Sequence, residues 1–166
     1  LAHIGIAVFV VGVTMVSSFQ EEKDVKMAPG DSVDVAGYHF TFKGVREVEG
    51  PNYVAAQGEF DLSANGKFLL KMTPEKRNYH SSQMPMTEAA IDAGFLRDVY
   101  VSLGEPIDRD KPEGEWAVRV YYKPFVDWIW GGCILMALGG LLAMLDRRYR
   151  VKARAAATVP AGSQHA

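Results

Sequence analysis

The 166-residue sequence has a single cysteine, Cys133, and two long stretches without a charged residue. One cysteine can form neither an internal disulfide nor a cysteine-rich metal site. The balance of 18 basic against 20 acidic residues excludes a strongly basic nucleic-acid-binding protein. The sequence also lacks a nucleophile triad, a phosphate-binding loop, a pair of catalytic carboxylates and a dinucleotide fingerprint. Nothing in it therefore predicts a self-contained active site.

The two uncharged stretches, residues 1–19 and 128–145, are apolar and long. A helix needs roughly 20 apolar residues to cross the hydrocarbon layer of a membrane. We therefore expect transmembrane helices over residues 1–19 and 125–146, the first of them truncated at its start. A secretory signal is the competing interpretation of the first stretch, which has no Met start, no basic flank and no clear cleavage site before Gln20.

The second span carries aromatic residues at its ends and small residues along one face. Trp128 and Trp130 at its start and Tyr149 beyond its end suit the two membrane interfaces. Gly132 and Gly139 share a face, and small residues let neighbouring helices approach closely. This pattern predicts packing in a helix bundle; the alternative is a single anchoring helix that tolerates glycine.

Basic residues after the second span give the orientation. The positive-inside rule places the end that carries them in the cytoplasm. We expect residues 147–166 to form a basic cytoplasmic tail and residues 20–124 to form an extracytoplasmic domain, periplasmic in a bacterium with an inner membrane. The basic residues are Arg147, Arg148, Arg150, Lys152 and Arg154.

The domain between the spans has the pattern of β-strands. Tyr38, Phe40 and Phe42 alternate with polar residues, which is the period of a half-buried strand. Residues 54–62 repeat that alternation, and Asn65-Gly66 then predicts a tight hairpin turn. Five to seven short strands predict a small all-β domain, an OB-like barrel first and a sandwich as the alternative. The other expected strands cover residues 33–35, 67–72, 99–103 and 116–122, and residues 87–96 form either a short helix or a loop.

His3 is the first candidate functional residue. An ionisable group inside a membrane span is costly and indicates function by default. At about 1.5 Å per residue, His3 lies roughly 24 Å from Phe19, near the cytoplasmic leaflet. Ala7, Thr14 and Ser18 continue its side of the helix and are small or polar. A neutral imidazole there can ligate a haem iron or conduct protons; the alternative is an interfacial histidine bonded to a neighbouring helix.

A second group of candidates lies in residues 77–91. Arg77 can pair with an acidic group such as a haem propionate, and its alternative is a solvated surface charge. Tyr79, His80, Met84 and Met86 are possible haem or partner contacts, although their spacing matches no zinc site. Two thioethers in a loop more commonly serve packing. His39 is expected at the surface and Cys133 as a small packing residue.

Four stretches resemble the C-terminal part of the CcmF/NrfE family of cytochrome c-type biogenesis proteins. They follow one another in the family's order along nearly the whole chain, and the Met-Pro-Met-Thr-Glu-Ala-Ala-Ile string is the most specific of them. Glycine-rich membrane helices that end in arginine are less specific. The four stretches are residues 2–5, 77–79, 84–91 and 130–150.

The resemblance implies a multi-pass haem lyase subunit of the bacterial inner membrane. Members accept haem from the chaperone CcmE, work with a CcmH-type subunit and join haem to apocytochrome c. They hold a haem b between two histidines near the cytoplasmic side, and His3 resembles one of these axial ligands. The other ligand and the family's tryptophan-rich haem-handling loop lie outside this sequence, so the chain by itself is not expected to be an active lyase.

The resemblance and the residues together leave two functions open. The first is a haem-binding and assembly part of a cytochrome c haem lyase, with the β domain as a scaffold or docking surface. The second is a two-span membrane protein whose extracytoplasmic β domain is a non-enzymatic interaction module. Haem bound through His3 distinguishes the two.

Overall fold

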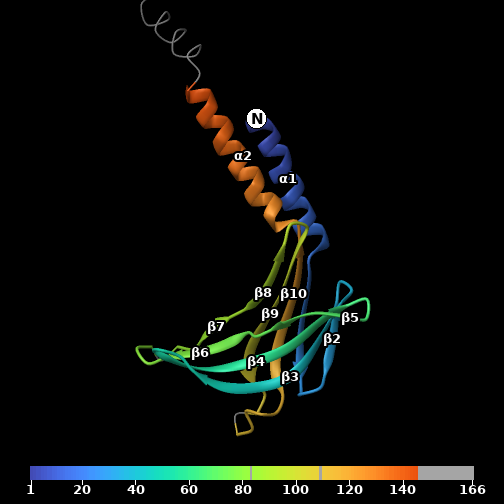
Figure 1. Ribbon diagram of the computed structural model, residues 1–166, viewed down its shortest axis with the longest axis vertical. Coiled ribbons are helices and arrows are strands. Elements are labelled where there is room, and N and C mark those ends of the chain that lie inside the picture. The colour runs from blue at the N-terminus through green and yellow to red at the C-terminus, as the bar shows by residue number, and fades with distance from the viewer. Residues whose placement is uncertain (83, 109, 146–166) are drawn as a thin grey trace, which may run out of the picture.

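The computed structural model describes residues 1–82, 84–108 and 110–145 and shows two helices joined to a β-sandwich (Figure 1). Both helices are long and apolar enough to cross a membrane. The expected cytoplasmic tail, residues 147–166, lies outside the described residues. The elements are α1 (Ala2–Phe19), β1 (Glu21–Met27), β2 (Ser32–Val35), β3 (Tyr38–Glu49), β4 (Tyr53–Ala64), β5 (Lys67–Met72), β6 (Glu75–Tyr79), β7 (Met86–Glu88), β8 (Ala90–Gly94), β9 (Arg97–Pro106), β10 (Trp116–Pro124) and α2 (Val126–Leu145).

The two helices run antiparallel and pack closely through glycines. Gly5 and Gly12 are buried on one face of α1, and Gly132 is buried on the facing side of α2. A Cβ atom added to Gly132 would lie 2.6 Å from the backbone nitrogen of Phe9, and one added to Gly5 would lie 2.6 Å from that of Met136. The absence of side chains at these glycines therefore lets the backbones approach. The predicted role of Gly132 in helix packing is confirmed, with α1 as its partner.

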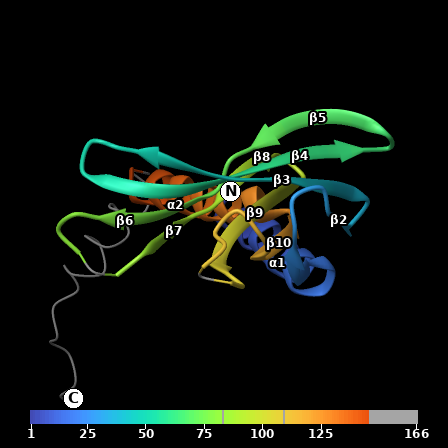
Figure 2. The same ribbon diagram turned by 90° about the horizontal axis from the view of Figure 1, so that it is seen from below.

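The β domain consists of two antiparallel sheets stacked face to face, which Figure 2 shows from below. One sheet has the strand order β1-β10-β9-β8, and the other has the order β2-β3-β4-β6-β7, with β5 paired to β4 alone. The expected architecture of two helices flanking a small all-β domain is confirmed, and the sandwich is the form it takes. The described part of the chain has ten strands, more than the five to seven expected.

Large apolar side chains from both sheets fill the space between them. Phe40 and Phe42 of β3 and Phe60 of β4 are fully buried, and the rings of Phe42 and Phe60 stack with centroids 4.8 Å apart. The alternation that predicted these strands is therefore confirmed by their burial. The predicted hairpin turn is also present, because Asn65 and Gly66 both have positive φ angles, 52° and 72°. The opposite sheet contributes Val99, Val101, Leu103, Trp116, Val118 and Val120.

A continuous segment carries the chain from one sheet to the other. β7 pairs with β6 in the larger sheet, β8 pairs with β9 in the smaller sheet, and Ala89 alone separates β7 from β8. A strand that changes sheets at a bend forms a corner of the sandwich. The expectation of a short helix or a loop over residues 87–96 is therefore wrong. The segment is mostly strand, and its small and polar residues lack the run of large apolar side chains that would have marked it.

Short linkers connect the helices to the sandwich. Gln20 alone separates α1 from β1, and Phe125 alone separates β10 from α2. Phe125 has a φ of 58°, a left-handed conformation that redirects the chain from strand to helix. β1 and β10 are paired, with Glu21 opposite Tyr122. The two helices therefore leave the sandwich from adjacent strands and lie side by side (Figure 1).

Candidate functional site

His3 lies in the first turn of α1, on the face that points away from α2. Its side is nearly opposite to that of Gly5, which packs against α2, because a helix turns once every 3.6 residues. The residue is exposed, and so are Ala7, Thr14 and Ser18 on the same face. Within the described residues the His3 side chain makes no hydrogen bond or ion pair. Its imidazole is therefore open to a ligand or to a further helix.

Three of the other candidates share one face of the larger sheet. In the strand registers, Tyr79 faces Tyr53 of β4, and Arg77 faces Met86 of β7. Side chains that alternate along a strand point to the same side, so Glu75, Arg77 and Tyr79 stand together on the side away from the core. We call this face the Arg77 surface. It consists of Tyr53, Glu75, Arg77, Tyr79, Met86 and Glu88.

The Arg77 guanidinium is held by acidic and aromatic neighbours on this surface. Its Nε donates to Glu75 Oε2 at 2.8 Å, and its Nη1 lies 3.5 Å from Glu88 Oε1. The guanidinium also lies over the Tyr53 ring, 4.7 Å from its centroid. The hydrogen bond from Arg77 lowers the pKa of the Glu75 carboxyl, and the bond from Gln57 acts in the same direction. Arg77 is thus a paired side chain rather than a free charge.

The β6–β7 loop carries the remaining two candidates. His80 donates its backbone N–H to the carbonyl oxygen of Asn52, and Met84 donates its own to Ser82 Oγ. The side chains of His80 and Met84 are exposed, Met84 to 75%. Met86, where β7 begins, is 54% exposed. In the described part of the chain no three His, Cys, Asp or Glu side chains converge in a way that could hold a metal ion. The loop and the Arg77 surface therefore present exposed thioethers and partly exposed aromatic rings at the surface of the sandwich.

The structure does not bring His3 near the Arg77 surface. α1 starts at the end of the helix pair farthest from the sandwich, whereas β6 and β7 lie at the side of the sandwich (Figure 1). The sequence interpretation missed Tyr53, Glu75 and Glu88 as partners of Arg77. A signal was present for one of them, because Glu75 and Arg77 are two residues apart and share a face of any strand that contains both.

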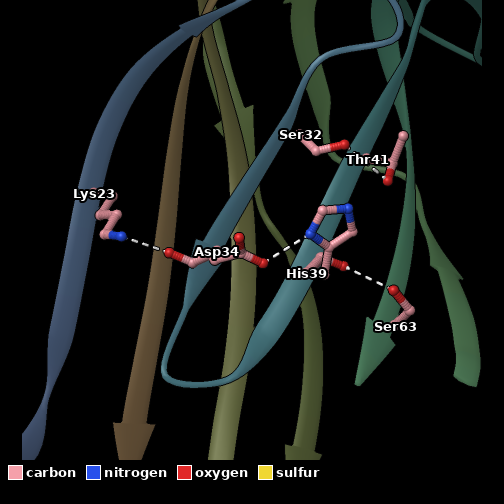
Figure 3. Close-up of polar contacts among 6 residues, drawn as sticks. All are labelled: Lys23, Ser32, Asp34, His39, Thr41 and Ser63. Atoms are coloured by element: carbon pink, nitrogen blue, oxygen red, sulfur yellow. Dashed lines mark hydrogen bonds and ion pairs between the residues drawn. The ribbon is translucent and has the colours of Figure 1, made fainter. Parts of the chain in front are cut away.

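His39 belongs to a polar cluster at the edge where β1 meets β2 (Figure 3). Its Nδ1 lies 2.7 Å from Asp34 Oδ1, and Lys23 of β1 donates to the Asp34 carbonyl oxygen. His39 is partly exposed at the surface, as expected, and its neighbours Ser32 and Thr41 bond to each other. The Lys23 side chain thereby links the two sheets at this edge, where β1 and β2 share no backbone ladder.

Two adjacent membrane-length helices that carry a β-sandwich between them define a class of helical membrane protein with an inserted β domain. The family model described as the CcmF C-terminal beta-sandwich matches residues 18–124, which is the whole sandwich. The cytochrome c-type biogenesis protein CcmF of Pseudomonas aeruginosa is 53% identical over 93% of this chain. The chain therefore belongs to the CcmF family.

Other relatives agree with this assignment. CcmF of Escherichia coli is 46% identical over 96% of the chain, and the cytochrome c-type biogenesis protein NrfE of Haemophilus influenzae is 36% identical over 89%. The chain covers 23% or 24% of the length of these three relatives. A solved structure named Cytochrome c Heme Lyase CcmF has the same fold over 87% of this chain and 24% of its own, with a TM-score of 0.69 at 20% identity.

Proposed function

We propose that the chain is the C-terminal part of a membrane haem lyase subunit for cytochrome c maturation, which binds haem and delivers it to apocytochrome c. The observation that carries the proposal is the 53% identity to a cytochrome c-type biogenesis protein over 93% of this chain. The chain covers about a quarter of the length of such relatives, so in this proposal catalysis belongs to the complete lyase and not to this chain alone. In this proposal residues 1–19 and 125–146 cross the bacterial inner membrane, residues 20–124 are periplasmic and residues 147–166 are cytoplasmic.

Within that assembly we propose His3 as an axial ligand of haem b. The fit rests on three features of the described chain: the imidazole is exposed, it faces away from α2, and it has no hydrogen-bond partner there. Ala7, one turn along the same face, leaves room beside it. An imidazole nitrogen is a common iron ligand, and the bound haem would supply a redox-active iron. The second ligand would come from a histidine outside this chain.

For the sandwich we propose a role in docking the haem chaperone CcmE, the CcmH-type subunit or the apocytochrome. The Arg77 surface and the neighbouring loop support a protein partner better than a direct haem contact. Arg77 already bonds Glu75 and Glu88, so a haem propionate would have to displace a carboxylate. The exposed thioethers of Met84 and Met86 suit an adaptable apolar interface.

Replacing His3 with alanine in the complete membrane complex tests the ligand role. The purified His3→Ala protein should lose most of its haem b absorption per protein, because one axial bond is missing. Added imidazole should restore part of the spectrum by occupying the vacated position. His39→Ala is the matched control, since His39 lies on the sandwich and bonds Asp34, and it should keep the spectrum of the parent.

The same experiment separates the proposal from the second candidate. A non-enzymatic interaction module would fold and insert without haem, and its spectrum would not depend on His3. An unchanged haem spectrum in His3→Ala would remove the ligand assignment. A protein that contains no haem at all would favour the interaction module.

A further inference from the structure

The β8–β9 turn carries two bulky apolar residues at its tip. Gly94 and Arg97 are opposite each other in the register, so Phe95 and Leu96 alone form the tip. Phe95 is 70% exposed and Leu96 is 55% exposed. Tight turns in water favour Gly, Asn, Asp and Ser, because these residues fit the backbone and tolerate solvent. Two exposed apolar side chains at such a tip indicate a surface that is not bathed in water.

The tip is fixed in place by the residues around it. Arg97 donates from Nη1 to the Asp92 carbonyl oxygen at 2.9 Å and from Nε to Tyr38 Oη at 2.8 Å. The Gly94 N–H donates to Asp98 Oδ1 at 3.2 Å. Arg97 also forms an ion pair with the Asp92 carboxylate. The charged groups beside the turn thus all have partners, and the tip itself remains apolar. Its position is set before any partner binds.

The tip lies beside the first turn of α2 (Figure 1). The Phe125 N–H donates to the Leu96 carbonyl oxygen at 2.8 Å, and the rings of Phe95 and Trp128 are 5.8 Å apart. Trp130, one helical turn from the start of α2, is 68% exposed. Aromatic residues at the end of a span lie at the membrane–water interface. The tip therefore lies at the same height along the axis of α2 as the start of that helix, where these tryptophans lie.

We propose that Phe95 and Leu96 insert into the interfacial region of the lipid leaflet on the sandwich side. The proposal rests on the proposed membrane insertion of α1 and α2. It gives the sandwich a third contact with the bilayer, beside the two helix ends. A third contact adds to the two short linkers in holding the tilt of the sandwich over the membrane.

Site-directed fluorescence tests this contact. The complete protein carries Cys133→Ala and one new cysteine labelled with an NBD fluorophore, in phosphatidylcholine–phosphatidylglycerol vesicles with or without brominated acyl chains. Phe95→Cys is the test position. Leu138→Cys, on an exposed side of α2, reports membrane insertion. Phe68→Cys on β5, which is 62% exposed and lies away from the helix ends (Figure 1), is the matched exposed phenylalanine.

The expected result is a blue-shifted emission and a loss of fluorescence in brominated lipid at positions 95 and 138, with neither change at position 68. Quenching at 138 without a blue shift or quenching at 95 would overturn the lipid contact and leave the membrane proposal intact. A blue shift at 95 without quenching would mean that another protein segment covers the tip, and it would also overturn the proposal. Absence of both the blue shift and the quenching at 138 would instead contradict the membrane insertion itself.

Discussion

At the scale of single residues, the Arg77–Glu75 pair shows how far sequence reasoning reaches. The sequence marked Arg77 as a candidate but missed Glu75, although two residues that are two positions apart share a face of any strand that contains both. Tyr53 and Glu88 could not be found in the same way, because they come from β4 and β7 and reach Arg77 only through the strand register. The exposed side of His3, in contrast, follows from the spacing between His3 and Gly5 on one helix.

The pair makes a prediction about pH. The Arg77 hydrogen bond lowers the folded-state pKa of Glu75, with partial burial acting in the opposite direction. A lowered carboxyl pKa stabilises the fold above the unfolded-state pKa, and this contribution is lost as the pH falls through the folded-state pKa. Arg77→Met should therefore destabilise the sandwich most near neutral pH, and the difference from the parent should shrink below about pH 4.

Urea unfolding in detergent, followed by the circular dichroism of the β-sheet, measures this difference. Lys43→Met is the control, because Lys43 pairs with Asp61 at 3.2 Å while 47% of the lysine side chain is exposed. Exposed ion pairs contribute little to stability, so this variant should follow the parent at every pH. A loss of stability in Arg77→Met that stays the same from neutral to acid pH would contradict the electrostatic explanation.

At the scale of elements, the sequence predicted the strands that bury alternate large side chains and missed those that do not. β3 and β4 were recognised because Phe40, Phe42 and Phe60 mark their inner face. β1 and β6 were missed because their sequences, Glu-Glu-Lys-Asp-Val-Lys-Met and Glu-Lys-Arg-Asn-Tyr, are mostly charged or polar. These strands are stabilised by ladder hydrogen bonds and cross-strand pairs, which a single strand's pattern does not reveal.

The helix pair makes a prediction of its own. Gly132→Ala should weaken the contact between α1 and α2 by about 1–3 kcal/mol, because the new methyl group would collide with the backbone at Phe9. Gly131→Ala is the matched control, since a Cβ atom there would meet nothing within 4 Å. It should leave the stability unchanged or raise it slightly, because alanine favours a helix.

Unfolding of the helices in increasing dodecyl sulfate, followed by helical circular dichroism, compares the two variants. The close contact requires that Gly132→Ala unfold at a lower detergent fraction than Gly131→Ala. Equal transitions in the two variants would show that the backbones do not approach each other as closely as the structure has them.

At the scale of the whole molecule, the sandwich and the helix pair differ in how much of their apolar surface is buried within the described chain. The sandwich has its own core, built from both sheets. Many helix residues that face away from the helix–helix contact are exposed within the described chain, among them His3, Val10 and Leu142. Such faces suit contact with lipid or with further helices. This agrees with the finding that the chain covers about a quarter of the length of its relatives. The sequence predicted this division from the two uncharged stretches, but not the short linkers, because linker length depends on where strand pairing ends.

The short linkers make a prediction about the whole molecule. Spin labels at Val13→Cys on α1 and Phe68→Cys on β5, in the Cys133→Ala background, should give a narrow distance distribution by pulsed electron spin resonance. Inserting Gly-Ser-Gly-Ser between Gln20 and Glu21 should broaden it, because a Gly/Ser linker is flexible. The same insertion after Glu113, in the β9–β10 connection away from the helices (Figure 1), is the control and should leave it narrow. A broad distribution in the parent would contradict rigid attachment.

A linker of one residue has no slack to take up rotation. Because β1 and β10 are paired and each continues into a helix, a force on the sandwich would act on α1 and α2 together as a torque. His3 lies at the end of α1 that is farthest from the sandwich. If the sandwich docks a partner as we propose, strain from that contact has a direct route along α1 to the residue that we propose holds iron.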